Sequence, residues 1–406
     1  MKKKINIPII VFLALLICVD IYASSEEKEF YKRGIKYIKK KLYDEALVEF
    51  QRSQSANPEF PYAYYGIGYA YHRKKMYDDA IAAYSKATEI KPDFAEVYVN
   101  LGLIYGDLGN DKESMVNVKK ALKINNKVKG GHYLLGRMLQ DKELYNQAIE
   151  EYKIELKKNT LYSGYTHGWL GLTYGLQGNY SEAIIHYKKA LEQYNDWTRL
   201  YYELGYAYLK KGEYENAIES FKNALEFKPN IPIVHYDLGR AYYSTGNYNK
   251  ARLNYKKAIN INPTNAAAYY ALGLVYYKKA IIFQDKKGAK QKGFFSLALE
   301  NFEKASELNP ELVEAYYMAG MIYYQIGITY FDNNVYNKAE REFKKVIDLN
   351  PRYNDIHYQL GWVYWEKGEW DKCVKEWKKE MEINPDNIYV KEWLSQARNK
   401  LKSERR

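Results

Sequence analysis

Apolar and small residues recur along this chain at spacings of three and four, and the whole pattern repeats every 34 residues. The pair Leu204–Gly205 returns 34 residues later as Leu238–Gly239, and after another 34 residues as Leu272–Gly273. Spacings of three and four place side chains on one face of an α-helix. A fixed period of about 20 to 50 residues predicts an array of similar, stacked units.

Each period contains two such helical faces. The first has an aromatic residue or histidine at its fourth position, a small residue at the eighth and usually an aromatic residue at the eleventh. The second has small residues at positions 20 and 27 around an aromatic residue, as in Ala217, Phe221 and Ala224. A glycine near position 15, such as Gly246, favours a left-handed end to the first helix, and a proline near position 32, such as Pro229, stops the second. Each period therefore predicts a helix, a turn and a second helix.

Ten units of this kind follow one another within residues 24–387. They begin at Glu27, Pro61, Ala95, Lys129, Gly164, Thr198, Pro232, Ala266, Val313 and Asn354. No single unit can bury both of its faces, so the ends of such an array need a cover. Residues 388–406 carry Trp393 and Leu394 among charged side chains, which predicts a helix that caps the last unit.

The spacing of these residues resembles that of the tetratricopeptide repeat family over about nine-tenths of the chain. The resemblance implies an all-α fold, a right-handed superhelical solenoid of helix-turn-helix repeats. It also implies a scaffold without cofactors that binds a protein or peptide. In this family the concave surface, built from positions 2, 5, 9, 12 and 13 of the first helix, is the usual binding surface.

Tyrosine is unusually abundant, with 46 residues, and part of this excess falls at position 5 of the units. That position holds Tyr31, Tyr65, Tyr133, Tyr202, Tyr236, Tyr270, Tyr317 and Tyr358. Tyrosine is also an ordinary scaffold residue of the family at this position, so both interpretations stay open there. Additional aromatic residues in units six to ten favour a binding groove in the C-terminal half, and Arg240 and Lys278 favour a ligand with acidic groups. The predicted partner-binding residues are Tyr202, Tyr206, Tyr236, Arg240, Tyr243, Tyr270, Tyr277, Lys278, Tyr317, Tyr324, Tyr358, Trp362 and Trp365.

Units eight and nine are longer than the others because each carries an insertion between its two helices. Unit eight covers 266–312 and unit nine covers 313–353, which are 13 and 7 residues more than the standard length. Seven residues equal about two helical turns, so both units are expected to have lengthened helices that form a ridge. The apolar residues available to hold it are Ile281, Ile282, Phe283, Ile326, Ile328, Tyr330 and Phe331. The ridge is either an accessory docking edge or packing that only stiffens the array.

Residues 1–23 are organised differently from the units. Lys2–Lys4 precede an apolar run, Ile7–Val19, and small residues follow from Ala23. This order predicts a secretory signal peptide that is cleaved after Ala23. The apolar run is shorter than the roughly 20 residues that span a bilayer, which disfavours the alternative of an uncleaved anchor. A lipid-modified Cys18 is a third interpretation, disfavoured by the bulky Ile17 before it.

No group of residues stands clear of the repeat as a catalytic or metal-binding set. Cys373 occupies the small position 20 of unit ten, which predicts a buried, inert thiol. The histidines at position 4 replace tyrosines of other units and are expected in the core; they are His132, His167, His235 and His357. No histidine or cysteine pair has the spacing of zinc ligands. We therefore expect no enzyme, no metal and no cofactor.

The sequence thus predicts an exported, non-catalytic adaptor, periplasmic or secreted, that binds peptides or partner domains through an aromatic concave groove. A place in a larger envelope complex is compatible with this hypothesis. The alternative is an envelope structural protein that binds a saccharide or an anionic surface, because stacked aromatic rings also suit sugars. The net charge of +12 is spread along the chain, so nucleic acid is not an expected partner. Membrane contact is expected only if the N-terminal segment remains uncleaved.

Overall fold

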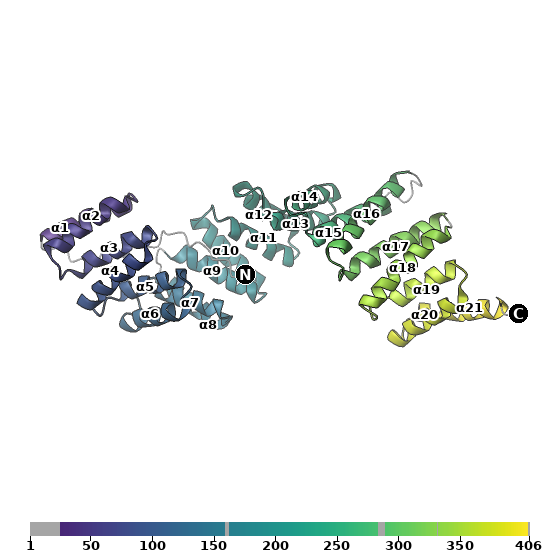
Figure 1. Ribbon diagram of the computed structural model, residues 1–406. Helices are drawn as coiled ribbons and strands as arrows, with labels where there is room; N and C mark the ends of the chain where they lie inside the picture. The colour runs from purple at the N-terminus through teal and green to yellow at the C-terminus, as the bar shows by residue number, and fades with distance from the viewer. Residues whose placement is uncertain (1–24, 159–161, 283–288, 331, 405–406) are drawn as a thin grey trace. The chain divides into compact units, whose positions relative to one another are not determined.

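The computed structural model describes residues 25–158, 162–282, 289–330 and 332–404. Within these ranges all regular structure is helical, with 21 α-helices and no strand (Figure 1). Within residues 26–210, and again within residues 214–404, helices that follow each other in the chain pack on one another. The predicted all-α solenoid of helix-turn-helix units is thereby confirmed. None of the described helices is both long enough and apolar enough to span a bilayer.

The chain forms two compact bodies, which meet in the sequence between Lys211 and Gly212. We refer to them as the N-terminal body and the C-terminal body. The described helices of the N-terminal body are α1 (Glu26–Lys39), α2 (Tyr43–Ala56), α3 (Pro61–Arg73), α4 (Tyr77–Ile90), α5 (Ala95–Asp107), α6 (Asp111–Ile124), α7 (Gly131–Asp141), α8 (Tyr145–Leu156), α9 (Ser163–Leu176), α10 (Tyr180–Gln193) and α11 (Thr198–Lys210).

The C-terminal body contains the two long units and the last helix of the chain. Its described helices are α12 (Tyr214–Phe227), α13 (Pro232–Ser244), α14 (Tyr248–Ile261), α15 (Ala266–Ile282), α16 (Ala289–Leu308), α17 (Val313–Tyr330), α18 (Asn333–Leu349), α19 (Ile356–Glu366), α20 (Trp370–Ile383) and α21 (Ile388–Glu404).

The turn between the two helices of a standard unit places its position-15 residue in the left-handed region. Glycine fills this position in most units, and Gly246, for example, has φ +74°. Lys41, Lys75 and Glu143 adopt φ +62° at the same position of units one, two and four. A left-handed non-glycine residue costs about 1 to 2 kcal/mol, so the turn geometry is maintained by the packing of the helix pair on either side.

A glycine at position 8 lets the two helices of a unit approach closely. A Cβ at Gly239 would lie 2.6 Å from the ring of Tyr255, and a Cβ at Gly273 would lie 2.7 Å from the ring of Phe302. Both rings stand at position 24 of the unit, on its second helix, and both are almost fully buried. In both units the core thus contains one large ring pressed against a glycine backbone, and in unit three Val118 takes the place of the ring.

The insertions lengthen all four helices of units eight and nine. These helices contain 17 to 20 residues, whereas α13 and α14 of unit seven contain 13 and 14. The predicted extension of the first helix of unit nine through Ile326 and Ile328 is confirmed, because α17 ends at Tyr330. Ile282 at the end of α15 is 60% exposed, whereas Ile326 and Ile328 of α17 are half-buried. Residues 1–24, Phe283 and Phe331 lie outside the described residues.

Candidate partner-binding surface

The tyrosines at position 5 of units seven, eight and nine pack on the second helix of their own unit. The ring centroid of Tyr236 lies 5.9 Å from that of Tyr255, Tyr270 lies 5.5 Å from Phe302, and Tyr317 lies 6.0 Å from Phe343. One face of each ring is therefore anchored on the core. Tyr236, Tyr270 and Tyr317 themselves are half-buried, so part of each ring remains open to solvent. We call these three residues the tyrosine row.

The same position is part of the core in the N-terminal body. Tyr31, Tyr65 and Tyr133 are each only 1% exposed, so in these units position 5 holds a scaffold residue of the core. Burial raises the pKa values of these phenols, which stay neutral. Each ring is covered by an aromatic residue that ends its unit: Tyr31 lies 5.8 Å from Phe60, Tyr65 lies 5.1 Å from Phe94, and Tyr133 lies 5.8 Å from Tyr162.

The covering aromatic residue is missing for two members of the tyrosine row. The residue that stands in the place of Phe94 is Asn265 after unit seven and Leu312 after unit eight. The Asn265 side chain accepts a hydrogen bond from the backbone N–H of Ala268 and so caps α15. Tyr317 does contact an aromatic residue, Tyr353, at 5.1 Å. Asn265 and Leu312 thus leave Tyr236 and Tyr270 without an aromatic cover, whereas Tyr317 is half-buried although Tyr353 lies beside it.

A second set of tyrosines stands about two helical turns further along α13, α15 and α17. Tyr243, Tyr277 and Tyr324 are half-buried. Burial raises the pKa of all three, and neighbouring tyrosines raise it further for Tyr243. Their hydroxyl groups are therefore neutral hydrogen-bonding groups at neutral pH. Together with the tyrosine row they give the first helices of units seven, eight and nine an amphipathic surface suited to binding.

The two cations predicted beside this surface differ in their surroundings. The Arg240 guanidinium donates a hydrogen bond of 2.8 Å to Asp237, whose side chain is 2% exposed. This pair is neutral as a whole, so Arg240 gives less attraction for an acidic ligand than the sequence suggested. Lys278 is exposed to solvent and has no such partner among the contacts of the described residues.

The predicted residues of unit ten are engaged by the last helix. Trp393 of α21 lies 4.8 Å from Trp362 and 5.5 Å from Trp365, measured between ring centroids. Tyr358 also packs edge-on against Trp362 at 6.0 Å. The predicted cap helix is present, and its tryptophan occupies the side of these rings that the next unit would cover. The open part of the surface in the C-terminal body is therefore carried by α13, α15 and α17.

Tyr202 and Tyr206 belong to the N-terminal body, where their rings lie 6.2 Å apart on α11. Tyr206 lines a small cavity of about 150 Å³ together with Glu203 and Arg199. Burial raises the pKa of Glu203, and the nearby Arg199 opposes this. The sequence prediction missed Glu203, since a charged residue at position 6 of a unit gives no sign of being enclosed.

The histidines at position 4 form polar pairs with position 23 of their own unit. His132 pairs with Glu151, His167 with His186, His235 with Asn254 and His357 with Glu376, at 2.5 to 3.2 Å. Among the described residues no group of three or more metal-ligating side chains exists. Cys373 is fully buried, and burial raises the pKa of its thiol to about 12, so the prediction of a buried thiol is confirmed.

The pair of His167 and His186 is expected to make unit five sensitive to acid. Burial lowers the pKa of His167, and burial with the charge of its partner lowers that of His186 to about 4. The pKa of a histidine in the unfolded chain is about 6.5, so the unfolded chain binds more protons than the folded chain between about pH 4 and pH 6.5. The stability that the neutral histidine pair contributes is therefore fully present above about pH 6.5 and is lost as the pH falls towards about 4. Hydrogen exchange in α9 and α10, corrected for its intrinsic pH dependence, should therefore be faster at about pH 5 than at about pH 7.

The variant His186→Glu supplies the control, because it copies the pairing of His132 with Glu151. A carboxylate stabilises the protonated imidazole, so acid should no longer accelerate exchange in α9 and α10 of this variant. The same acceleration in α3 and α4 of the unchanged protein would show that the histidine pair is not the cause.

The paired helices, the glycine-on-ring cores and the open helical surface define a helical-repeat scaffold. A family model described as TPR repeat matches residues 74–109, 171–212, 205–246, 239–279 and 328–368, and one described as tetratricopeptide repeat matches residues 95–128. Together the matches cover about half of the chain. The chain belongs to the tetratricopeptide repeat family, whose members are typically non-catalytic scaffolds for protein interactions.

Several solved structures are similar to part of the chain. The crystal structure of MamA is 25% identical, covers 48% of this chain and 94% of its own, and has a TM-score of 0.40. PilF of Pseudomonas aeruginosa is 24% identical over 54% of this chain and 94% of its own, with a TM-score of 0.43. The C-terminal part of a TPR repeat-containing protein from Cytophaga hutchinsonii is 22% identical over 61% of this chain and 96% of its own, with a TM-score of 0.45. No curated protein matches the chain.

Proposed function

We propose that this protein is an extracytoplasmic adaptor that binds a peptide or partner domain on the open surface of α13, α15 and α17. The observation that carries the proposal is the tyrosine row. Three successive units expose part of a tyrosine ring that is anchored on the core from behind, whereas Tyr31, Tyr65 and Tyr133 are covered. Rigid, half-exposed aromatic rings provide much binding area at little entropic cost, and they are typical centres of protein interfaces.

Site-specific photocrosslinking tests this proposal. A photoactivatable phenylalanine at position 270 should form covalent adducts with a protein partner in extracts of the native envelope. The matched control has the same group at position 269, because Tyr269 is also half-buried but points to a different side of α15. Equal adducts from both positions, or adducts from position 269 alone, would contradict the proposed surface.

The extracytoplasmic setting rests on the N-terminal sequence. We expect the mature protein to begin near Ser24, because the charged start, the short apolar run and the small residues match a cleaved signal. N-terminal sequencing of the protein purified from its native cell checks this. Retention of Met1, or a mature chain that starts with a lipid-modified Cys18, would refute cleavage after Ala23.

A further inference from the structure

One position of the second helix is apolar in nearly all units and charged in only two of them. It directly follows the small residue at position 20, and its apolar members are Leu47, Ile81, Met115, Ile149, Ile184, Ile218, Leu299 and Val374. The two exceptions are Glu340 in unit nine and Arg252 in unit seven. A charged side chain at a partly buried, otherwise apolar position needs a counter-charge, so we compare the charged neighbours of Glu340 and Arg252.

Glu340 has its partners within the protein. Its carboxylate lies 2.5 Å from Lys367 Nζ and 2.7 Å from Lys344 Nζ, and it accepts a hydrogen bond of 3.0 Å from the Tyr364 hydroxyl. Burial alone would raise the pKa of Glu340, but these hydrogen bonds outweigh it and lower the pKa to about 2. The carboxylate of Glu340 in unit nine is thus paired with two lysines beside the end of α19, the first helix of unit ten.

Arg252 and Lys279 occupy the equivalent places in units seven and eight, and among the described residues no carboxylate pairs with them. Lys279 stands at the position of Lys367, and its Nζ donates a hydrogen bond of 2.6 Å to the side-chain oxygen of Asn249, a neutral amide. Burial and then the charge of Arg252 lower the pKa of Lys279. Arg252 Nε is buried without a hydrogen-bond partner in the described structure. Two neighbouring cations therefore repel each other without a counter-charge among the described residues.

The equivalent positions of units one and two hold an ion pair, in which an aspartate stands at the position of Asn249. Lys74, at the position of Lys279, pairs with Asp44 at 2.5 Å, and Asp44 stands at the position of Asn249. The scaffold therefore accommodates a carboxylate beside this lysine in unit one. In unit seven an amide stands there instead, and the positive charge remains available to an external anion.

The lengthened helices add an apolar wall beside these cations. A recess of about 590 Å³ lies between the start of α14, which carries Asn249, and the helices α15 and α16, and Lys279, Ile282 and Phe294 line it. Ile282 is 60% exposed. The Lys279 ammonium lies 5.6 Å from the centroid of the Phe294 ring. A cation and two apolar side chains thus face the same space.

We propose that this recess binds a partner peptide in which a carboxylate side chain neighbours an apolar one. The carboxylate pairs with Lys279 in the positive field of Arg252, and the apolar side chain packs on Ile282 and Phe294. A peptide fits both features, whereas a simple anion would leave the apolar wall unused. The site does not depend on the tyrosine row, because the two share no residue.

Fluorescence anisotropy with the full-length mature protein tests the site. The probe is a labelled peptide of alternating glutamate and leucine, and the comparison peptide has glutamine in place of glutamate. Lys279→Gln and Arg252→Leu should each weaken binding of the glutamate peptide at least about tenfold, since each removes a charge that acts on the carboxylate. Leucine is already present at the equivalent position of units one and eight, so Arg252→Leu is compatible with the helix pair.

Asn249→Asp provides the sharpest variant, because it adds the internal carboxylate of unit one without removing either cation. This variant should also bind the glutamate peptide at least about tenfold more weakly than the unchanged protein does. The matched control is Lys74→Gln, which changes the net charge equally at a lysine that already has its carboxylate. Its affinity should stay within about twofold of the unchanged protein, the range expected for general charge effects.

Four results would overturn the proposal. The first is an equal loss of affinity for the glutamate peptide in Lys74→Gln and Lys279→Gln, and the second is equal affinity of the unchanged protein for the glutamate and glutamine peptides. The third is that the unchanged protein does not bind the glutamate peptide. The fourth is that inorganic phosphate displaces this peptide completely and that each variant loses affinity for phosphate as much as for the peptide. The last result would assign the recess to small anions. Ala variants of the tyrosine row should leave peptide binding intact, so failure of this site and failure of the proposed aromatic surface are distinguishable.

Discussion

Replacing Tyr236, Tyr270 and Tyr317 together by alanine is expected to weaken partner binding at least about a hundredfold. Each ring is fixed on the core by an aromatic neighbour and keeps a part exposed, which is the arrangement of an interface hot spot. A hot spot contributes roughly 2 kcal/mol or more, and 1.4 kcal/mol corresponds to a factor of ten, so two of the three suffice for this loss. Affinity for the crosslinked partner measures the effect, and circular dichroism checks that the helices remain.

The control for this prediction has to come from the same body. From the sequence alone, Tyr31, Tyr65 and Tyr133 would serve, but these rings are buried and their removal would damage the core of the N-terminal body. The better comparison is the double variant of Tyr269 and Tyr316 against that of Tyr270 and Tyr317. These pairs are adjacent in the chain and similarly buried, yet they face different sides of their helices. Equal losses of affinity in the two double variants would argue against the tyrosine row.

The local features of the fold could be predicted from the sequence because they depend on residues within one unit. The 34-residue period gives the helix pairs, and the left-handed turn follows from position 15, where Gly246 and its equivalents stand. The lengthening of α17 follows from an insertion of two helical turns. In each case the hydrophobic period or one backbone preference decides the outcome.

The candidate surface was harder to predict because exposure is set between units. Tyr65 and Tyr270 occupy the same position, but Phe94 covers the first ring while Leu312 stands at the equivalent place beyond the second. The charge of Arg240 is likewise neutralised by Asp237, one helical turn before it. The recess at Lys279 exists only because the lengthened helices of unit eight extend past the turn of unit seven. Position within the repeat gives the direction of a side chain, and its neighbours decide what remains exposed.

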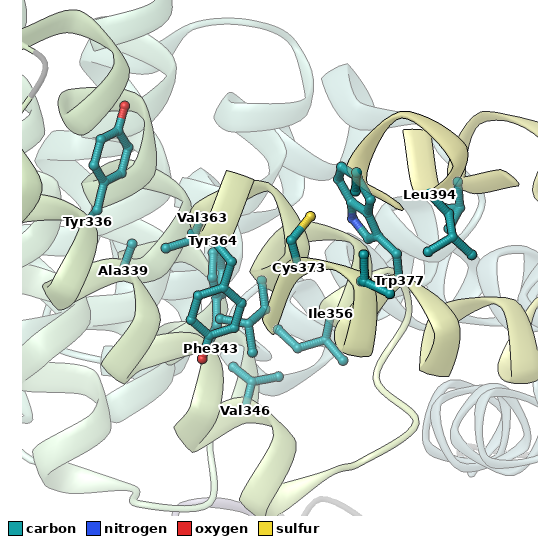
Figure 2. Close-up of a cluster of buried hydrophobic side chains, with 14 residues drawn as sticks. Tyr336, Ala339, Phe343, Val346, Ile356, Val363, Tyr364, Cys373, Trp377 and Leu394 are labelled. Atoms are coloured by element: carbon teal, nitrogen blue, oxygen red, sulfur yellow. The ribbon is translucent and has the colours of Figure 1, made fainter. Parts of the chain in front are cut away.

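The end of the C-terminal body is held by a cluster of buried hydrophobic side chains, which Figure 2 shows. Trp377 of α20 is fully buried, and its indole N–H donates a hydrogen bond of 3.1 Å to the backbone carbonyl of Tyr358 on α19. Its ring lies 5.3 Å from Trp362 and 5.7 Å from Trp365. A Cβ at Gly361 would overlap this indole, so α19 approaches it with its bare backbone. The same ring therefore joins both helices of unit ten.

Trp377→Ala is expected to destabilise unit ten by about 3 to 5 kcal/mol, because it leaves a cavity the size of an indole. Units of a solenoid contact only their neighbours, so the loss should be confined to the end of the array. Hydrogen exchange should quicken in α19, α20 and α21, while α1 to α4 keep their protection. The matched control is Trp370→Ala on the same helix, whose half-buried ring contacts Trp365 at 5.1 Å and should cost less. A uniform loss of protection along the chain, or an equal cost at Trp370, would show that Trp377 is not the local anchor of unit ten.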